Sequence, residues 1–321
     1  MSSSNLRAAK KAKNDEFYTR LEDIEAEISQ HEDYVRQFQG KVVLCNCDDP
    51  EWSNFFVFFK LHFKQLGLKK LITTHYNPDG SPSYKLEWEG EMLNDDMVNL
   101  IKTPLKGNGD FRSEECIEIL KEADIVVTNP PFSIAREAFI PLLCEFDKKF
   151  VIIGDLNWVA YKGVFPLFKE NKIAFGYTNV KEFSTPAGTM QKFGNKTWYT
   201  NLDLDKSHEP LILNKNYHGN EARYPKYVNG DAIECSKVSN IPKDYYGKIG
   251  VPVTYMSQHC QDQFIILGSS GDRQFAKKIE TVVPDDSVFT KGGPSFYIKT
   301  GEKEYCRIYN RIIIQRKPAK E

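Results

Sequence analysis

The sequence predicts an α/β protein, in which a parallel sheet covered by helices is followed by a smaller, β-rich region. Two observations predict this. Short apolar runs that suit buried strands alternate with amphipathic segments as far as about residue 205. Beyond that point the helical periodicity disappears, and Gly, Pro, Asn and Tyr become frequent. The 321 residues suffice for about two domains, which we place at residues 1–205 and 206–321.

The elements of the first domain follow from periodicity and capping residues. Apolar positions at helical spacing predict a helix between residues 19 and 40, and an aromatic-rich segment predicts another over residues 53–66. Ser113 is suited to cap a third helix, and a fourth begins at Ser133. The predicted strands are residues 42–45, 70–74, 124–128, 150–153, 173–175 and 197–202. Residues 84–93 alternate in the way expected of an edge hairpin.

Composition excludes several classes of protein. The chain is 40% hydrophobic and 27% charged, so it is neither a disordered tail nor a fibre nor a disulfide-rich scaffold. Its seven cysteines are scattered without a C-x-x-C pair, which predicts a reducing compartment and no metal site. The N-terminus lacks the apolar stretch of a signal peptide, and apolar runs reach only about five residues. We therefore expect a cytoplasmic protein.

The charge is balanced overall but unevenly distributed. The 43 Lys and Arg residues oppose 44 Asp and Glu residues, a net charge of -1, which by itself does not indicate a nucleic-acid partner. Residues 1–13, however, carry no acid, and residues 299–321 carry a local excess of positive charge. The candidate contacts to phosphates or bases in these two segments are Lys10, Lys11, Lys13, Arg307 and Arg311. If both lie on one strand, Arg307 and Arg311 share a face that suits phosphates or guanine edges. Equally, the two charges could protect an edge strand from pairing with another chain.

The most specific motif is Asn129-Pro130-Pro131-Phe132, which follows an apolar strand directly. In an open α/β sheet, ligands bind at this end of the strands. An Asn side-chain oxygen and the carbonyl of Pro130 can each accept one N–H of an exocyclic amine, and the prolines keep both acceptors in place. Phe132 offers a ring on which a flat base can stack. The motif therefore suits methylation of an amino group on a ring, although a plain proline-rich turn has the same composition.

The chain resembles the EcoRI-type family of adenine-specific DNA methyltransferases over most of its length. Besides the Asn-Pro-Pro-Phe motif, the segments that carry this resemblance are residues 14–19, 45–50, 66–72, 109–111 and 198–201. The resemblance implies a Rossmann-like sheet that binds S-adenosyl-L-methionine, with residues 206–321 as the target-recognition region. It also implies N6-methylation of an adenine that is rotated out of double-stranded DNA.

Site residues can be carried over from the family position by position. For the cofactor they are Phe17, Tyr18, Thr19, Asn46, Cys47, Asp48, Asp49, Asp110 and Phe111, and for the extruded base Trp198 and Tyr199. Asn129, Pro130, Pro131 and Phe132 take the catalytic role. No glycine-rich loop follows the first strand, and the second strand ends in His75-Tyr76-Asn77 where an acid would ordinarily bind the ribose. Asn77 is the candidate for that contact.

Three functions remain open from the residues alone. The first is a site-specific DNA adenine methyltransferase, acting as a monomer and either paired with a separate restriction endonuclease or alone. The second is a methyltransferase for RNA or for a protein glutamine amide, because those sites use a similar turn. The third is a non-catalytic DNA-binding protein on the same scaffold. The intact motif and the large β-rich region favour the first.

Overall fold

The computed structural model describes residues 18–47, 51, 53–77, 79–90, 92–94, 97–98, 100–132, 135–185, 188–271, 274–275, 295–301 and 305–318. The chain divides into two compact units. The first comprises Met1–Leu156 and Phe175–Leu204, and the second comprises Asn157–Ala174 and Asp205–Glu321. The sequence did not distinguish Asn157–Ala174 from its neighbours, because this segment continues the alternation of apolar and polar runs.

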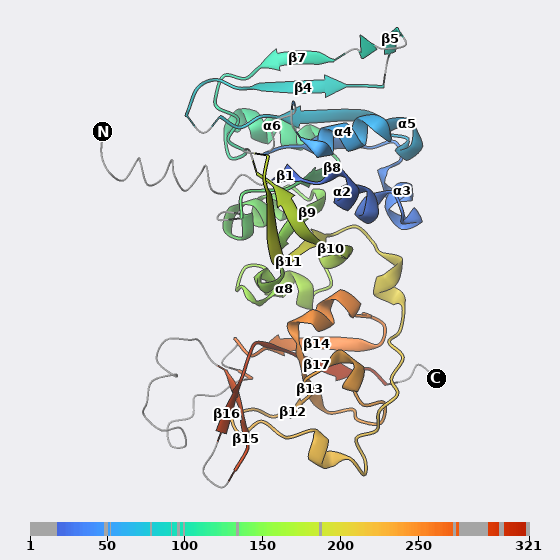
Figure 1. The fold of residues 1–321 in the computed structure, drawn as a ribbon, viewed down its shortest axis with the longest axis vertical. Coiled ribbons are helices and arrows are strands. Elements are labelled where there is room, and N and C mark those ends of the chain that lie inside the picture. Colours follow the sequence, from blue (N-terminus) through green and yellow to red (C-terminus); the bar gives the residue numbers. More distant parts are fainter. Residues whose placement is uncertain are drawn as a thin grey trace, which may run out of the picture. The chain divides into compact units, whose positions relative to one another are not determined.

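Among the described residues, nine strands form the central sheet of the first unit, in the order β1-β10-β11-β9-β8-β2-β3-β4-β7 (Figure 1). Their bounds are β1 Tyr18–Thr19, β2 Val42–Cys45, β3 Lys70–Thr74, β4 Tyr84–Trp88, β7 Ile101–Pro104, β8 Ile125–Thr128, β9 Lys149–Asp155, β10 Ala174–Ser184 and β11 Met190–Thr200. Strands β3, β2, β8 and β9 are parallel, which confirms the predicted parallel core. The outer strands pair antiparallel, and β5 Met92–Asn94 and β6 Met97–Val98 form a separate pair.

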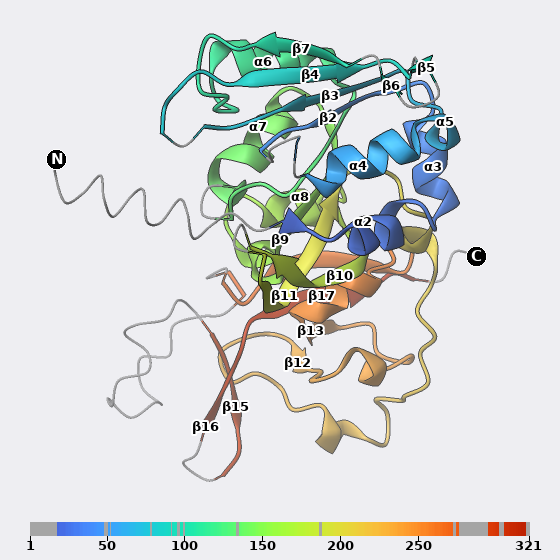
Figure 2. The same ribbon diagram turned by 45° about the horizontal axis from the view of Figure 1, so that its top comes forward.

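Helices cover both faces of this sheet. They are α2 Leu21–Ile28, α3 Glu32–Phe38, α4 Asn54–Leu61, α5 Phe63–Leu66, α6 Glu114–Glu122 and α7 Ile140–Glu145, with a π-helix at Ala135–Phe139 leading into α7. The strand face of Val43, Leu71 and Val127 packs against apolar side chains of α2 to α5. Helices α6 and α7 lie on the opposite side (Figure 2). Alternation of side chains along each strand thus buries both faces, as a parallel sheet requires.

Three helix ends are capped, among them the one predicted at Ser113. Ser53 precedes α4 and accepts a hydrogen bond from the backbone N–H of Phe55 at 3.2 Å. Gly67 ends α5 with a left-handed φ of 61°, a conformation that glycine adopts without strain. Ser113 caps α6 by accepting from the backbone N–H of Cys116 at 3.3 Å.

The helix predicted between residues 19 and 40 is instead two helices, α2 and α3. Glu27, near the end of α2, directs its buried carboxylate toward β10. There it accepts from the backbone N–H groups of Tyr177 at 2.8 Å and Thr178 at 2.7 Å. It also accepts from the Tyr34 hydroxyl at 2.9 Å. Burial raises the pKa of Glu27, and the hydrogen bonds from Thr178, Tyr177 and Tyr34 oppose this effect.

Strands β10 and β11 are each 11 residues long, whereas the sequence predicted only short runs at 173–175 and 197–202. The first part of β11 is largely exposed and its last five residues are buried. Polar residues in the exposed part therefore conceal the apolar alternation by which strands are recognised.

The second unit contains a four-stranded sheet in the order β12-β13-β17-β14 and a separate pair, β15-β16. The bounds are β12 Ile233–Glu234, β13 Lys248–Pro252, β14 Phe264–Ser269, β15 Phe296–Lys299, β16 Tyr305–Ile308 and β17 Arg311–Arg316. Helix α8 spans Phe165–Lys169, and short 3-10 helices lie at Leu156–Ala160, Asp205–His208, Glu221–Arg223, Val238–Asn240 and Val253–Gln258. Tyr227, Ala232, Phe296, Ile308 and Ile313 form a small apolar core. No helix in the described part of the chain is long and apolar enough to span a membrane.

Candidate active site

The candidate site lies at the point in the parallel sheet where the strand order reverses. Strand β2 pairs with β3 on one side and with β8 on the other, and all three run in the same direction. The chain leaves the carboxyl ends of β2 and β8 toward opposite halves of the sheet. Such a switch point opens a crevice outside the strand ends, where ligands bind in open α/β sheets.

A hydrogen bond joins the two turns at this switch point. The Thr128 hydroxyl, at the end of β8, donates to the backbone carbonyl of Asn46, which follows β2. Asn129 is the next residue after Thr128, and both Asn46 and Asn129 are only 7% exposed. Cys47 has a φ of 77°, an uncommon conformation for a residue with a side chain. The structure therefore brings the catalytic motif together with part of the predicted cofactor segment.

The start of the described chain reaches the same region. The carbonyl of Thr19 accepts a hydrogen bond at 2.7 Å from Nδ2 of Asn54, the first residue of α4, which follows the turn after β2. Thr19 Oγ1 and Asn46 Oδ1 are buried, and neither meets a hydrogen-bond partner in the described part of the chain. Because buried polar atoms are normally hydrogen-bonded, these two oxygens are suited to a bound polar ligand.

A third segment, the loop at 108–111, lies against the end of β3. The backbone N–H of Asn77 donates to the carbonyl of Asn108 at 2.7 Å. Gly109 has a φ of 81°, and a Cβ there would lie 1.9 Å from the carbonyl oxygen of His75, so only glycine fits. Phe111 is buried with its ring edge-on to Phe139 at 5.0 Å. The loop and the end of β3 thus form one wall beside the turn after β2.

The carboxylate of Asp110 is held by its neighbour Arg112. Arg112 donates from Nε at 2.9 Å, from Nη2 at 2.5 Å and from its backbone N–H at 2.9 Å. These contacts, the side-chain hydrogen bond above all, lower the pKa of Asp110. Asp110 therefore stays ionised, as an acceptor for an amino group must.

Phe132 is the last residue of the motif and its aromatic member. Its ring meets those of Phe183 and Phe193 edge-on, with centroids at 6.0 and 6.4 Å. The ammonium of Lys196 lies 4.1 Å from the centroid of Phe132. Lys196 is 7% exposed and forms an ion pair at 3.2 Å with Asp155, the last residue of β9. The structure thus places a buried positive charge against the aromatic ring of the motif.

Comparison with known proteins decides the family. The sequence profile of the family described as "Adenine-specific methyltransferase EcoRI" matches residues 5–317. The type II methyltransferase M.EcoRI of Escherichia coli is 43% identical over 290 residues, which cover 82% of this chain and 88% of that protein. The type II methyltransferase M.MpnI of Mycoplasma pneumoniae is 41% identical over 278 residues, covering 81% and 83%. The chain belongs to the EcoRI family of adenine-specific methyltransferases.

A third relative, the type II methyltransferase M.MgeORF184P of Mycoplasma genitalium, is 42% identical over 280 residues, covering 81% of this chain and 84% of its own. No solved structure matches the chain. The expected family is therefore confirmed, and the protein is an enzyme, a site-specific DNA methyltransferase that modifies adenine.

Two predicted residues of the methyltransferase do not match their expected role. Trp198 and Tyr199 are fully buried in β11. Trp198 packs against Phe55, with centroids at 6.1 Å, and the Tyr199 hydroxyl donates to the carbonyl of Asp155 at 2.7 Å. A base can stack only on an accessible ring face. Trp198 and Tyr199 are therefore part of the hydrophobic core.

Phe132 and Phe193 are partly exposed aromatic residues that pack against the core cluster containing Trp198. Sequence reasoning missed Phe193, Lys196 and Asp155. The available signal was Lys196 itself, a cation that begins the buried end of β11. Phe17, Asp48 and Asp49 of the predicted cofactor segment lie outside the described residues, as do Lys10, Lys11 and Lys13.

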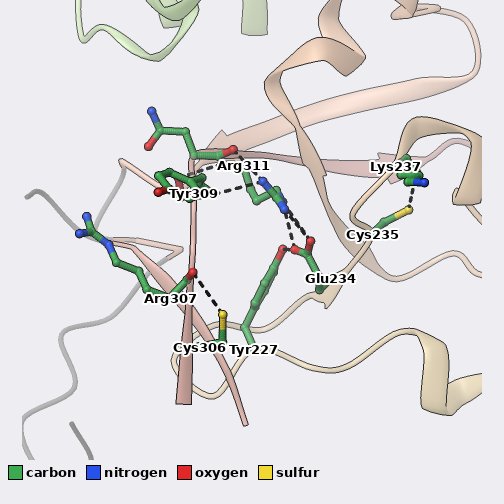
Figure 3. Close-up of polar contacts among 10 residues, drawn as sticks. Tyr227, Glu234, Cys235, Lys237, Cys306, Arg307, Tyr309 and Arg311 are labelled. Atoms are coloured by element: carbon green, nitrogen blue, oxygen red, sulfur yellow. Dashed lines mark hydrogen bonds and ion pairs between the residues drawn. The ribbon is translucent and has the colours of Figure 1, made fainter. Parts of the chain in front are cut away.

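The predicted pair of DNA contacts, Arg307 and Arg311, is also corrected. They do not share one strand: Arg307 is in β16 and Arg311 begins β17. The side chain of Arg311 is 13% exposed and forms a 2.7 Å ion pair with the buried carboxylate of Glu234 (Figure 3). Arg307 is exposed. Of this pair, Arg307 therefore remains as a candidate contact to DNA.

Proposed function

We propose that the enzyme transfers a methyl group from S-adenosyl-L-methionine to N6 of an adenine that is rotated out of double-stranded DNA. The observation that carries this proposal is the Asn129-Pro130-Pro131-Phe132 turn at the switch point, tied to Asn46 by the hydroxyl of Thr128. The adenine specificity of the family supplies the target. A base within the duplex stack cannot bring its amino group to a protein pocket, so the base must leave the stack.

Asn129 and Pro130 orient the amino group. Asn129 Oδ1 and the carbonyl of Pro130 accept its two N–H bonds, which directs the nitrogen lone pair away from these acceptors. Neither acceptor removes a proton before transfer. The nitrogen forms its bond to the methyl carbon while the bond between that carbon and sulfur breaks, and one N6 proton then passes to solvent. The turn acts by preorganised hydrogen bonding.

The cofactor supplies a methyl group activated by a positively charged sulfur. Thr19 Oγ1 and Asn46 Oδ1 fit such a ligand, because both are buried acceptors that lack a partner in the described part of the chain. Tyr18 and Cys47 adjoin them, and the Asp110 carboxylate and the Phe111 ring are assigned to the adenine moiety of the cofactor. Phe17, Asp48 and Asp49 keep the cofactor role that the family resemblance gives them.

The remaining assignments concern the rest of the protein and its partners. Residues 1–205 are assigned to catalysis and 206–321 to recognition of the target sequence. The basic residues Lys10, Lys11 and Lys13 are assigned to the DNA backbone. We take the enzyme to act as a cytoplasmic monomer, either beside a separate restriction endonuclease or alone.

Methyl transfer can be tested with radiolabelled S-adenosyl-L-methionine. The purified enzyme is incubated with plasmid DNA, total RNA and a mixture of proteins in parallel, and the modified DNA is digested to nucleosides and sequenced. We expect label in DNA, as N6-methyladenine at one short sequence. Label confined to RNA or protein, or a methyl group on another base, would contradict the proposal.

A further inference from the structure

A corner of the second unit carries three exposed side chains of the kinds that contact DNA. The chain passes from β16, which pairs with β15, into β17, a central strand of the four-stranded sheet. Tyr309 and Asn310 form the connection between them, and Tyr309 is 90% exposed. Asn310 is exposed, and so is Arg307, near the end of β16.

A buried ion pair lies beneath this corner. Glu234 is 5% exposed, and it accepts hydrogen bonds from Arg311 Nε at 3.1 Å and Nη2 at 2.7 Å. The hydroxyl of Tyr227 donates to the same carboxylate (Figure 3). Burial and the adjacent Glu234 charge together raise the pKa of Tyr227, so its hydroxyl keeps its proton. A fork–fork pair of this kind fixes the plane and position of the guanidinium.

The same guanidinium holds the backbone of the corner. Nη1 of Arg311 donates to the carbonyls of Tyr309 and Asn310, both at 3.3 Å (Figure 3). The hydroxyl of Ser270 accepts from the backbone N–H of Arg311 at 3.0 Å, and the N–H of Ser270 donates to the Arg311 carbonyl at 2.8 Å. Nε, Nη1 and Nη2 are thus all engaged within the protein, and Arg311 has no edge left for a bidentate contact to phosphate or guanine.

Isolated exposed aromatic residues are common on protein surfaces and need no special explanation. Tyr309 differs in that its backbone is fixed by a buried ion pair. Side-chain ordering reduces affinity, and a group that is already held in place avoids part of that loss. Arginine reads guanine or phosphate, asparagine reads adenine, and an aromatic ring stacks on a base or wedges between bases. Arg307, Tyr309 and Asn310 bring these three side-chain types together.

We infer that this corner, Arg307 to Asn310, contacts the DNA substrate of the methyltransferase, with Tyr309 as the stacking or wedging group. Arg311 and Glu234 act as its internal support and do not touch DNA. The inference rests on the proposed role of residues 206–321 in target recognition.

Tyr309→Ala tests the inference, because removing a side chain that is 90% exposed leaves the packing unchanged. The dissociation constant is measured by fluorescence anisotropy on a duplex that carries the methylated sequence, and on the same duplex with one base pair changed. We expect binding to the first duplex to weaken about tenfold, since stacking on an aromatic ring stabilises a base contact substantially. Tyr309→Phe keeps the ring and should bind nearly as tightly as the wild type.

Ile212→Ala is the matched control, since Ile212 is an 87% exposed apolar residue of the same unit. The single-turnover rate of methyl transfer at saturating DNA should be the same in Ile212→Ala as in the wild type. Equal dissociation constants for Tyr309→Ala and Ile212→Ala would overturn the inference, and so would equal weakening by Tyr309→Phe and Tyr309→Ala. A wild-type enzyme that transfers no methyl to DNA would contradict the proposed function instead.

Discussion

Lys196 holds a positive charge against the ring of Phe132, the aromatic residue of the Asn-Pro-Pro-Phe motif. Its side chain is 7% exposed, and its ammonium lies 4.1 Å from the centroid of that ring and 5.3 Å from that of Phe193. Asp155 balances the charge at 3.2 Å, and Asn195 donates to the same carboxylate oxygen at 2.5 Å. A desolvated cation over an aromatic face contributes about 2 kcal/mol. Lys196 is therefore suited to hold the plane of the ring on which a base would stack.

Lys196→Met should slow methyl transfer by about tenfold, because the variant keeps the length of the side chain but loses the cation–π contact and the ion pair. Single-turnover kinetics at saturating DNA and cofactor measure this change. Lys192→Met on the same strand is the control, because the Lys192 side chain is 84% exposed. Lys196→Arg should retain most of the rate. Equal rates in Lys196→Met and Lys192→Met would show that Lys196 does not position Phe132.

Single residues also mark the limit of prediction from sequence. Arg307 and Arg311 look alike in the sequence, yet one is exposed and the other is bound to Glu234, 77 residues earlier in the chain. The family resemblance assigns Trp198 and Tyr199 to the extruded base, whereas the structure buries both in a central strand. Contacts between residues far apart in sequence decide such roles, and residue type alone does not reveal them.

At the scale of elements, the sequence predicted best where the signal was local. The apolar runs of β2, β3 and β8 and the cap at Ser113 all follow from neighbouring residues. The break between α2 and α3 has no such local signal, because no proline or glycine lies between Leu21 and Phe38. Strands β10 and β11 were predicted too short because their outer parts are polar and exposed.

His259 is a half-buried histidine of the second unit. It follows the 3-10 helix at Val253–Gln258 and reaches Asn171, which follows helix α8. His259 contacts the hydroxyl of Tyr255 at 2.9 Å and Oδ1 of Asn171 at 3.3 Å. A neutral ring satisfies both, accepting from the hydroxyl and donating to the amide oxygen. Burial, followed by the positive charge of Lys317, lowers the pKa of His259 to about 4.

The free energy of unfolding should therefore fall as the pH decreases from the ordinary pKa of histidine toward about 4. In that range the unfolded chain binds a proton that the folded chain excludes. Urea denaturation of the wild type and of His259→Gln, compared at about pH 7 and about pH 5, isolates the contribution of this residue from those of the carboxylates. The wild type should lose more stability than the variant. An equal loss in both would mean that His259 is not held neutral.

At the scale of the whole molecule, the net charge of -1 does not show how the charges are distributed along the chain. Binding to a duplex depends on the cations that lie against phosphates, because each one releases counterions. The sequence suggested two arginines near the C-terminus for this role, and the structure leaves one of them, Arg307, exposed. A balanced chain can therefore still bind DNA through a local cluster.

Arg307→Ala should weaken DNA binding and reduce the slope of log Kd against log salt by about 1, if Arg307 meets a phosphate. Titrations of a fluorescent duplex at several salt concentrations measure that slope. Lys237→Ala is a suitable control, because it also removes one exposed cation from the second unit. A slope equal to that of the control would remove Arg307 from the DNA-binding surface.

In the proposed mechanism, the turn after β8 activates the adenine amino group by hydrogen bonding. Asn129→Ala tests it most directly, with cofactor affinity measured by calorimetry and methyl transfer measured in a single turnover on the same preparation. Loss of one preorganised hydrogen-bonding group should slow transfer by about 100-fold or more, while cofactor affinity stays close to that of the wild type. A variant that binds cofactor and methylates DNA at the wild-type rate would contradict the claim.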